Sequence, residues 1–460
     1  NGKVYATNVN GNTINIHSIS VTGELANETP ISLSNLPGYG PGVVNSVAVK
    51  NGVVAVAYGN ATPGEPGHVA LFDAASHALL NVIEVGVLPD QVTFNANGTM
   101  LLVANEAEAI SVANNPYGTI SMIDLSDGAA TATVSNTISF EALNGSEGAL
   151  FSKGLTLYPG FQAAADIEPE YITISPDGTR AYVTLQEVNA VAVLDLTNPD
   201  ADSPIAIKPL GFIDRSLSGN AFDPSDRDGG IHIKNAPVFG VLQPDSLTSF
   251  AVGGVTYFVT ANEGDARVGS GIEDTDIARL SSVTLDPTAF PNAAALQANA
   301  ELGRLNILTK LGDTDGDGDY DQIYALGGRS ISIFRQEADG SITKVRETGG
   351  EFEAIIAATH PELFNSNQNV APSSVDTRSD DKGPEPEGVT VGEIDGRMYA
   401  FVGLERVGGF MVYDVTDPEN AVFVTYKPET ALDLGPEVQT FVAAANSPIG
   451  QSLLISGNEI

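Results

Sequence analysis

A two-part motif recurs along the chain, and it constrains the fold more than any other feature of the sequence. Each copy begins with Pro and an acidic residue, continues as a short strand and a tight turn, and ends with a second strand and another acidic residue. Every copy predicts a β-hairpin. The copies run over residues 89–106, 169–187, 244–263, 386–405 and 436–459.

Further strands follow several of these hairpins, for example at 119–124, 190–195 and 409–414. A four-stranded antiparallel unit that is repeated along a chain indicates a β-propeller, in which the units surround a central axis. We therefore predict the all-β class. Two weaker hairpins, at 45–56 and 321–334, bring the expected number of blades to seven.

The last copy has only inner strands, so we expect the opening strands of the chain to complete that blade and close the ring, with residues 1–22 paired to 451–460. The propeller would form a single domain over 1–460. Long insertions are expected near 141–168, 216–243, 265–320 and 346–384, with a helix at 292–302. Loops of this length are usually functional or disordered.

The acidic residues of each motif are expected to meet at one mouth of the channel. The two strands of a hairpin are antiparallel, so the start of the first lies beside the end of the second. The predicted funnel contains Asp90, Glu106, Glu170, Glu187, Asp245, Glu263, Glu387 and Glu405, together with Glu437 and Glu459 of the last copy. So many carboxylates repel one another unless cations bind, and oxygen-only ligands favour Ca²⁺, Mg²⁺ or Mn²⁺. The alternative is that each Pro-acid pair is a turn; recurrence favours metal.

Three basic residues lie next to these acids although basic residues are scarce in the chain. They are Arg406, Arg267 and Lys382. A cation beside metal-binding acids suits an oxyanion such as phosphate, so these three are the candidate catalytic residues. The alternative is a salt bridge that neutralises one acid.

A separate acidic loop occupies residues 313–321. Its spacing is typical of calcium loops, with ligands at Asp313, Asp315, Asp317, the backbone of Asp319, and Asp321. At the twelfth position Tyr324 replaces the usual bidentate Glu, and a strand is expected to follow. We predict a structural calcium ion here rather than a solvated acidic turn.

Composition excludes several classes of function. The net charge of −37 argues against nucleic acid or an anionic membrane as a partner. The chain has no Cys, so it has neither disulfides nor thiolate metal sites. It has no apolar run long enough to span a bilayer, no Gly-x-Ser-x-Gly elbow and no phosphate-binding loop of the nucleotide hydrolases. Its Gly- and Pro-rich, Lys-poor composition, and its start at Asn1 without Met, are expected of a processed, exported protein.

Specific motifs extend over nearly the whole chain, at 88–94, 103–106, 243–245, 260–267, 313–321, 378–389 and 403–409. At these residues the sequence resembles the bacterial choice-of-anchor I surface-protein family, which is related to a sea-urchin mesenchyme-specific cell-surface glycoprotein and to atypical cyanobacterial alkaline phosphatases. The resemblance implies a phytase-like propeller with a metal-filled funnel. It also implies export to the cell surface, the extracellular space or the periplasm, often with a C-terminal anchor that this chain is expected to lack. One departure is Ala107-Glu108, where the family tends to have Gly-Glu.

Two functions fit these observations. The first is a metal-dependent phosphoesterase that acts on a small phosphorylated substrate, with Arg406, Arg267 or Lys382 neutralising the phosphoryl charge. The second is a calcium-binding surface or matrix protein without catalysis, whose partners are cations or mineral. Self-association is compatible with both.

Overall fold

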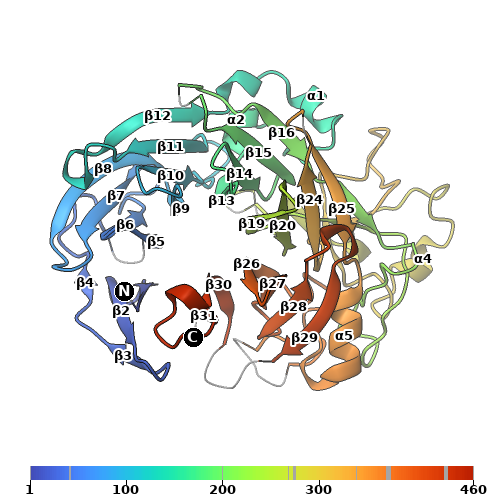
Figure 1. Ribbon diagram of the computed structural model, residues 1–460. Coiled ribbons are helices and arrows are strands. Elements are labelled where there is room, and N and C mark those ends of the chain that lie inside the picture. Colours follow the sequence, from blue (N-terminus) through green and yellow to red (C-terminus); the bar gives the residue numbers. More distant parts are fainter. Residues whose placement is uncertain are drawn as a thin grey trace.

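Small sheets follow one another around a common axis, and the two ends of the chain lie side by side (Figure 1). The computed structural model describes residues 2–40, 43–198, 200–267, 269–272, 276–337, 339–368, 374–428 and 434–458. Nearly all strand pairs are antiparallel neighbours in sequence, which is the pairing of a β-propeller. The predicted all-β propeller class is confirmed.

Three consecutive sheets have four strands in simple sequence order. The strands are β5 (Val44–Lys50), β6 (Val53–Tyr58), β7 (Pro66–Asp73) and β8 (Leu79–Val87); β9 (Pro89–Phe94), β10 (Met100–Asn105), β11 (Thr119–Asp124) and β12 (Thr133–Ser139); and β13 (Pro169–Ile174), β14 (Arg180–Leu185), β15 (Ala190–Asp195) and β16 (Ala206–Pro209). The hairpins predicted at 45–56, 89–106 and 169–187 are the inner strands of these sheets.

Two further sheets of the ring also have four strands. They consist of β19 (Leu247–Val252), β20 (Val255–Asn262), β24 (Ser330–Gln336) and β25 (Ile342–Glu347), and of β26 (Pro386–Ile394), β27 (Arg397–Leu404), β28 (Phe410–Asp414) and β29 (Val422–Lys427). In the first of them, the long insertion between β20 and β24 separates neighbours in the sheet. β24 pairs with β20, so it is the third strand of that sheet.

The insertions build an additional sheet outside this pattern. Its strands, in spatial order, are β17 (Phe212–Asp214), β18 (Phe239–Val241), β23 (Tyr324–Ala325), β22 (Asn306–Leu308) and β21 (Ile277–Arg279). β18 and β23 pair in parallel. The predicted hairpin at 321–334 is therefore wrong: its first half belongs to this additional sheet and its second half to β24, because Gly327 and Gly328 carry the chain from one sheet to the other.

The chain ends form two separate sheets among the described residues. The first contains β1 (Lys3–Asn8), β2 (Thr13–Ile19), β3 (Leu25–Asn27) and β4 (Ile31–Ser32), and the second contains β30 (Pro436–Val442) and β31 (Leu453–Asn458). β1 contacts β5, and β30 contacts β26. No ladder of the described residues pairs 2–22 with 451–458, so the closure and the seven-blade count stay predictions.

Helices are few and lie in the connections. They are α1 (Glu147–Phe151), α2 (Ala163–Asp166), α4 (Ala293–Leu296) and α5 (Glu351–Thr359), with 3₁₀ turns at Ala129–Thr131, Glu141–Leu143, Leu280–Ser282, Pro361–Leu363, Pro418–Asn420 and Ala444–Asn446. The helix predicted over 292–302 is only α4, because the chain folds back there and Leu302 N donates to Leu296 O. Within the described residues, none of the helices is long and apolar enough to cross a membrane.

The core lies between neighbouring sheets, which pack face to face. Side chains of β10 that point to opposite faces of the sheet, such as Leu101 and Leu102, belong to two different apolar clusters. The same burial on both faces is found in β6 and β14. This stacking holds the inner strands rigidly, and so fixes where each motif begins and ends around the axis.

Candidate metal centre

The Pro-acid step of four motifs interrupts the ladder where the inner strand begins, whereas Pro244 and Asp245 lie just before β19. Register shifts occur beside Pro89, Pro169, Pro386 and Pro436. Proline cannot donate to a ladder, and a bulge at a strand end re-aims the side chain that follows it. The acid after each of these four prolines therefore leaves the alternation of its strand, at the same end of the sheet where the second strand finishes.

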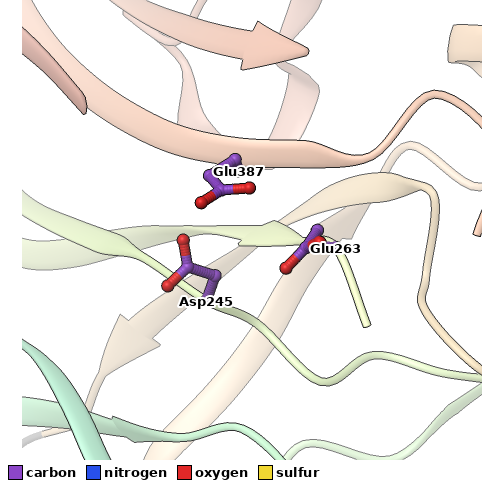
Figure 2. A group of neighbouring side chains, drawn as sticks. All are labelled: Asp245, Glu263 and Glu387. Atoms are coloured by element: carbon purple, nitrogen blue, oxygen red, sulfur yellow. The ribbon is translucent and has the colours of Figure 1, made fainter. Parts of the chain in front are cut away.

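The predicted acids gather around one cavity of about 350 Å³, which we call the funnel. Its lining includes all eight predicted acids of the first four copies, Asp90, Glu106, Glu170, Glu187, Asp245, Glu263, Glu387 and Glu405, and also Lys382 and Arg406. Figure 2 shows Asp245, Glu263 and Glu387, which lie just before β19, directly after β20 and in β26. The predicted convergence of these side chains is confirmed. Glu459 lies outside the described residues, and Glu437 is absent from the lining, although its charge acts on Asp245.

The funnel also contains residues that the motif did not predict. The polar ones are Glu108, Glu168, Gln186 and Asp265. Each lies within two residues of a motif acid or directly precedes its Pro, so a search of the flanking positions would have found them. Glu108 follows Ala107, whose φ of 60° is the conformation that Gly adopts most easily. The Gly-to-Ala departure thus keeps the backbone that brings Glu108 to the funnel.

Burial and mutual repulsion raise the pKa values of these carboxyls. Burial is the largest cause throughout. It raises the pKa of Asp90 to about 6, with Glu108 adding repulsion, and that of Glu187 to about 7, with Asp265 adding repulsion. The pKa of Glu263 rises to about 8, although Lys382 opposes the shift. Burial also raises, well above the usual range, the pKa values of Glu106, Glu168, Glu170, Asp245 and Glu387.

Two oxygens of the funnel are buried without any hydrogen-bond partner among the described residues. They are Glu170 Oε2 and Glu187 Oε2, on side chains that are 6% and 5% exposed. A buried charged oxygen without a partner is costly, and a bound cation relieves that cost. Carboxylate oxygens of Asp245, Glu263 and Glu387 lie within 4.8 Å of one another, close enough to bind one ion together. An all-oxygen donor set of this kind fits a hard divalent cation.

The two basic residues of the funnel are already engaged by acids. Lys382 Nζ lies 2.5 Å from Glu263 Oε1 and 3.3 Å from Glu385 Oε2. Arg406 lies 2.7 Å from Glu405 Oε1 and 3.5 Å from Glu385 Oε2. Glu385 is completely buried and also pairs with Arg378. The Glu385 carboxylate therefore contacts both basic side chains of the funnel, Lys382 and Arg406.

Arg267 does not line the funnel, and its prediction as a substrate-facing residue is wrong. Its side chain is 4% exposed, and its guanidinium pairs with Asp166 of α2, with Nε 2.6 Å from Oδ1 and Nη2 3.1 Å from Oδ2. Nη2 also donates to the backbone oxygen of Thr156. Arg267 thus connects the 141–168 insertion to the loop after β20. This agrees with the alternative interpretation, a salt bridge that neutralises an acid.

The 313–321 loop brings carboxylates together as its spacing predicts, but on the surface. Oxygens of Asp313, Asp315 and Asp321 lie within 4.8 Å of one another, and Asp286, Asp319 and Asp321 form a second such group. Asp317 belongs to neither group; its Oδ1 accepts from the backbone of Asp319. Gly316 and Gly318 have φ of 82° and 99°, which lets the loop turn back on Asp313. The calcium ion itself stays a prediction.

The chain is similar to proteins of one family and to two curated animal proteins. The family model described as "Choice-of-anchor I domain" matches residues 1–418. Gigasin-3a of Magallana gigas is 35% identical over 122 residues, which are 26% of this chain and 42% of that protein. The mesenchyme-specific cell surface glycoprotein of Strongylocentrotus purpuratus is 30% identical over 276 residues, which are 54% of this chain and 35% of that protein. The chain thus matches less than half the length of either relative.

Solved structures with a similar arrangement include the β-propeller domain of Myceliophteria thermophila Cps50 (Swd1), at 8% identity and a TM-score of 0.42, covering 99% of this chain and 93% of that one. Hydrazine synthase of Kuenenia stuttgartiensis has 11% identity and a TM-score of 0.46, covering 99% of this chain and 92% of that one. Such similarities carry no information about activity.

Proposed function

The chain belongs to the choice-of-anchor I domain family, and from this premise we propose that it is a divalent-cation-dependent phosphoester hydrolase of the cell surface or extracellular space. The location is supported by the family description and by the cell-surface glycoprotein among the relatives. The observation that carries the chemical proposal is the funnel, where buried acids outnumber basic side chains and two carboxylate oxygens have no hydrogen-bond partner in the described part of the chain.

The acids of the funnel would hold the cations. Asp245, Glu263 and Glu387 supply one set of oxygens, and the unpartnered oxygens of Glu170 and Glu187 indicate further ligands. Ca²⁺, Mg²⁺ and Mn²⁺ all accept such ligands. A divalent cation at this place would polarise a phosphoryl oxygen and lower the pKa of a water molecule that attacks it.

Lys382 and Arg406 would bind the phosphoryl group of the substrate. Both line the funnel, and Glu385 fixes them from the protein side. A guanidinium and an ammonium that are held in place before the substrate arrives favour the charge that develops on the phosphoryl oxygens. No nucleophilic side chain of the protein is required.

A second function is favoured by the same ion pairs. Lys382 contacts the carboxylates of Glu263, Asp265 and Glu385, and Arg406 contacts those of Glu385 and Glu405, so in this function the two basic residues serve to neutralise the acids. The protein would then bind cations at the surface without catalysis.

The two functions are separated by assaying a chromogenic phosphate monoester and a diester with Ca²⁺, Mn²⁺ or a chelator. In the catalytic case, Glu387→Gln abolishes cation-dependent phosphate release, whereas Glu393→Gln, an exposed acid at the other end of β26, has no effect. Cation binding without any phosphate release by the wild type would favour the second function. The absence of both would contradict both.

A further inference from the structure

Two groups of carboxylates at the funnel share one residue, Glu263. In each group, one oxygen of every residue lies within 4.8 Å of the others. The first group contains Asp245, Glu263 and Glu387 (Figure 2), and the second contains Glu263, Glu385 and Glu405. Two cations held side by side by acidic residues are a common arrangement in sites of phosphoryl transfer. The two groups differ, however, in the basic side chains that the protein places beside them.

Basic side chains are scarce in the first group. Among the ion pairs of the described residues, none includes Asp245 or Glu387, and Glu263 pairs only with Lys382. Asp245, Glu263 and Glu387 all line the funnel, so an ion that enters the funnel reaches them. The first group is therefore the position for the divalent cation of the proposed function.

The second group contains the ammonium of Lys382. Nζ lies 2.5 Å from Glu263 Oε1, 3.3 Å from Glu385 Oε2 and 3.7 Å from Asp265 Oδ1. The side chain of Lys382 is only 13% exposed. A positive charge that is supplied by the protein thus lies among carboxylate oxygens of three residues, which is the environment that a divalent cation prefers.

The hydrogen bonds of Glu385 show that the ammonium satisfies this group only in part. Glu385 is completely buried. Its Oε1 accepts from Arg378, but its Oε2 accepts no hydrogen bond from the described residues, although Lys382 lies 3.3 Å away. A buried carboxylate oxygen without a donor is costly. A metal ion binds such an oxygen directly, so Glu385 Oε2 marks a second position where a cation can bind.

We propose that the ammonium of Lys382 fills the second of two adjacent cation positions that share Glu263, and thereby keeps a second divalent cation out of the funnel. A metal ion and an ammonium in the same position would repel each other strongly, because the surrounding groups are buried. This inference rests on the proposed binding of a divalent cation by the first group, and it adds that the protein supplies the neighbouring cation itself. A phosphoryl oxygen between the two positions would then meet one metal ion and one compact donor of hydrogen bonds.

Removal of the ammonium should therefore increase the number of bound ions. The experiment counts calcium ions per chain by atomic emission, after equilibrium dialysis of the EDTA-treated protein against CaCl₂. We expect Lys382→Ala, which removes both the charge and the side chain that fills the position, to bind one ion more than the wild type. The double variant Lys382→Ala/Glu385→Gln should return to the wild-type number, because Glu385 belongs to the second group only.

The matched control is Lys234→Ala. Lys234 Nζ lies 2.6 Å from the carboxylate of Glu301, outside the two groups of the funnel, so this variant should bind the wild-type number of ions. Circular dichroism in CaCl₂ establishes that each variant is folded. An unchanged number of ions in folded Lys382→Ala would overturn the inference and leave the proposed cation site of the first group intact. An additional ion that persists in the double variant would also overturn it.

If Lys382→Ala does not fold, wild-type crystals grown with MnCl₂ give the answer. An anomalous peak beside Asp245 and Glu387, with none between Glu263 and Glu385, supports the inference. Peaks at both groups contradict it, because the ammonium then does not exclude the second ion. A wild type without a peak at either group contradicts both the inference and the proposed cation binding on which it rests.

Discussion

The funnel and the 313–321 loop contain the same chemical groups in opposite environments. In the loop, nine consecutive residues carry five Asp whose side chains are largely exposed. In the funnel, the acids come from four motifs that are far apart in sequence; half of these acids are buried and the others are partly buried. Water and salt screen the loop charges, whereas the funnel charges repel one another in a medium of low polarity. Burial of the carboxylates, rather than their number, therefore decides how strongly a bound cation is needed.

The largest expected effect is on stability as a function of pH without divalent cations. The folded-state pKa values of Glu187, Glu263 and Glu405 are raised to about 7, 8 and 7, above those of the unfolded chain. The folded state therefore holds protons that the unfolded state has lost, and the free energy of unfolding should fall as pH rises from about 4.5 to about 8, by a few kcal/mol in total.

Urea unfolding in EDTA at several pH values measures this slope, and excess Ca²⁺ should remove most of it because an ion that binds only the folded state stabilises it. A stability that rises over this pH range in EDTA would contradict the burial of ionised acids in the funnel.

Glu170→Gln should stabilise the protein without divalent cations but not with them. In EDTA the variant should be more stable than the wild type, by about 1–3 kcal/mol, because a neutral amide replaces a buried carboxyl group whose Oε2 has no hydrogen-bond partner among the described residues. With Ca²⁺ the advantage should disappear, since a ligand is lost. Thermal melts in both conditions test this. Equal shifts in EDTA and in Ca²⁺ would mean that Glu170 binds no ion.

Lys382→Met should separate cation binding from phosphate release in the funnel. Removing the ammonium leaves Glu263 and Glu385 without one of their partners, so the cation-free protein should lose about 3 kcal/mol or more. Cation binding should persist, because the carboxylates remain, while phosphate release should be lost. Calcium counting beside the phosphoester assay gives the result, and loss of bound calcium instead would show that Lys382 supports the metal ligands.

The smallest effect is expected in the exposed loop. Asp315→Asn should weaken calcium binding there and lower the melting temperature in Ca²⁺ only slightly, by less than Glu387→Gln does. In EDTA it should be neutral or slightly stabilising, because repulsion from Asp317 first raises the pKa of Asp315 in the wild type. Calorimetric titration compares the two variants. A larger loss for Asp315→Asn than for Glu387→Gln would reverse the comparison.

Sequence patterns predicted the parts of the site that lie inside a motif. The Pro-acid step and the acid after the second strand were sufficient to place Asp90, Glu106 and their equivalents at one mouth, because strand polarity follows from a hairpin alone. The same reasoning failed for Arg267, whose partner Asp166 comes from a different insertion. It also failed for residues 321–334, which two different sheets share.

By itself, the sequence determined the propeller class, the mouth to which the acids converge and the turn of the 313–321 loop, since all three depend on interactions between neighbours along the chain. Only the tertiary structure decided which charges are paired. Whether Lys382 pairs with Glu263, and whether Glu170 Oε2 has a hydrogen-bond partner among the described residues, depend on segments far apart in sequence. Ion pairing and burial act through space over a few ångströms, and the folded insertions alone bring those side chains within that range.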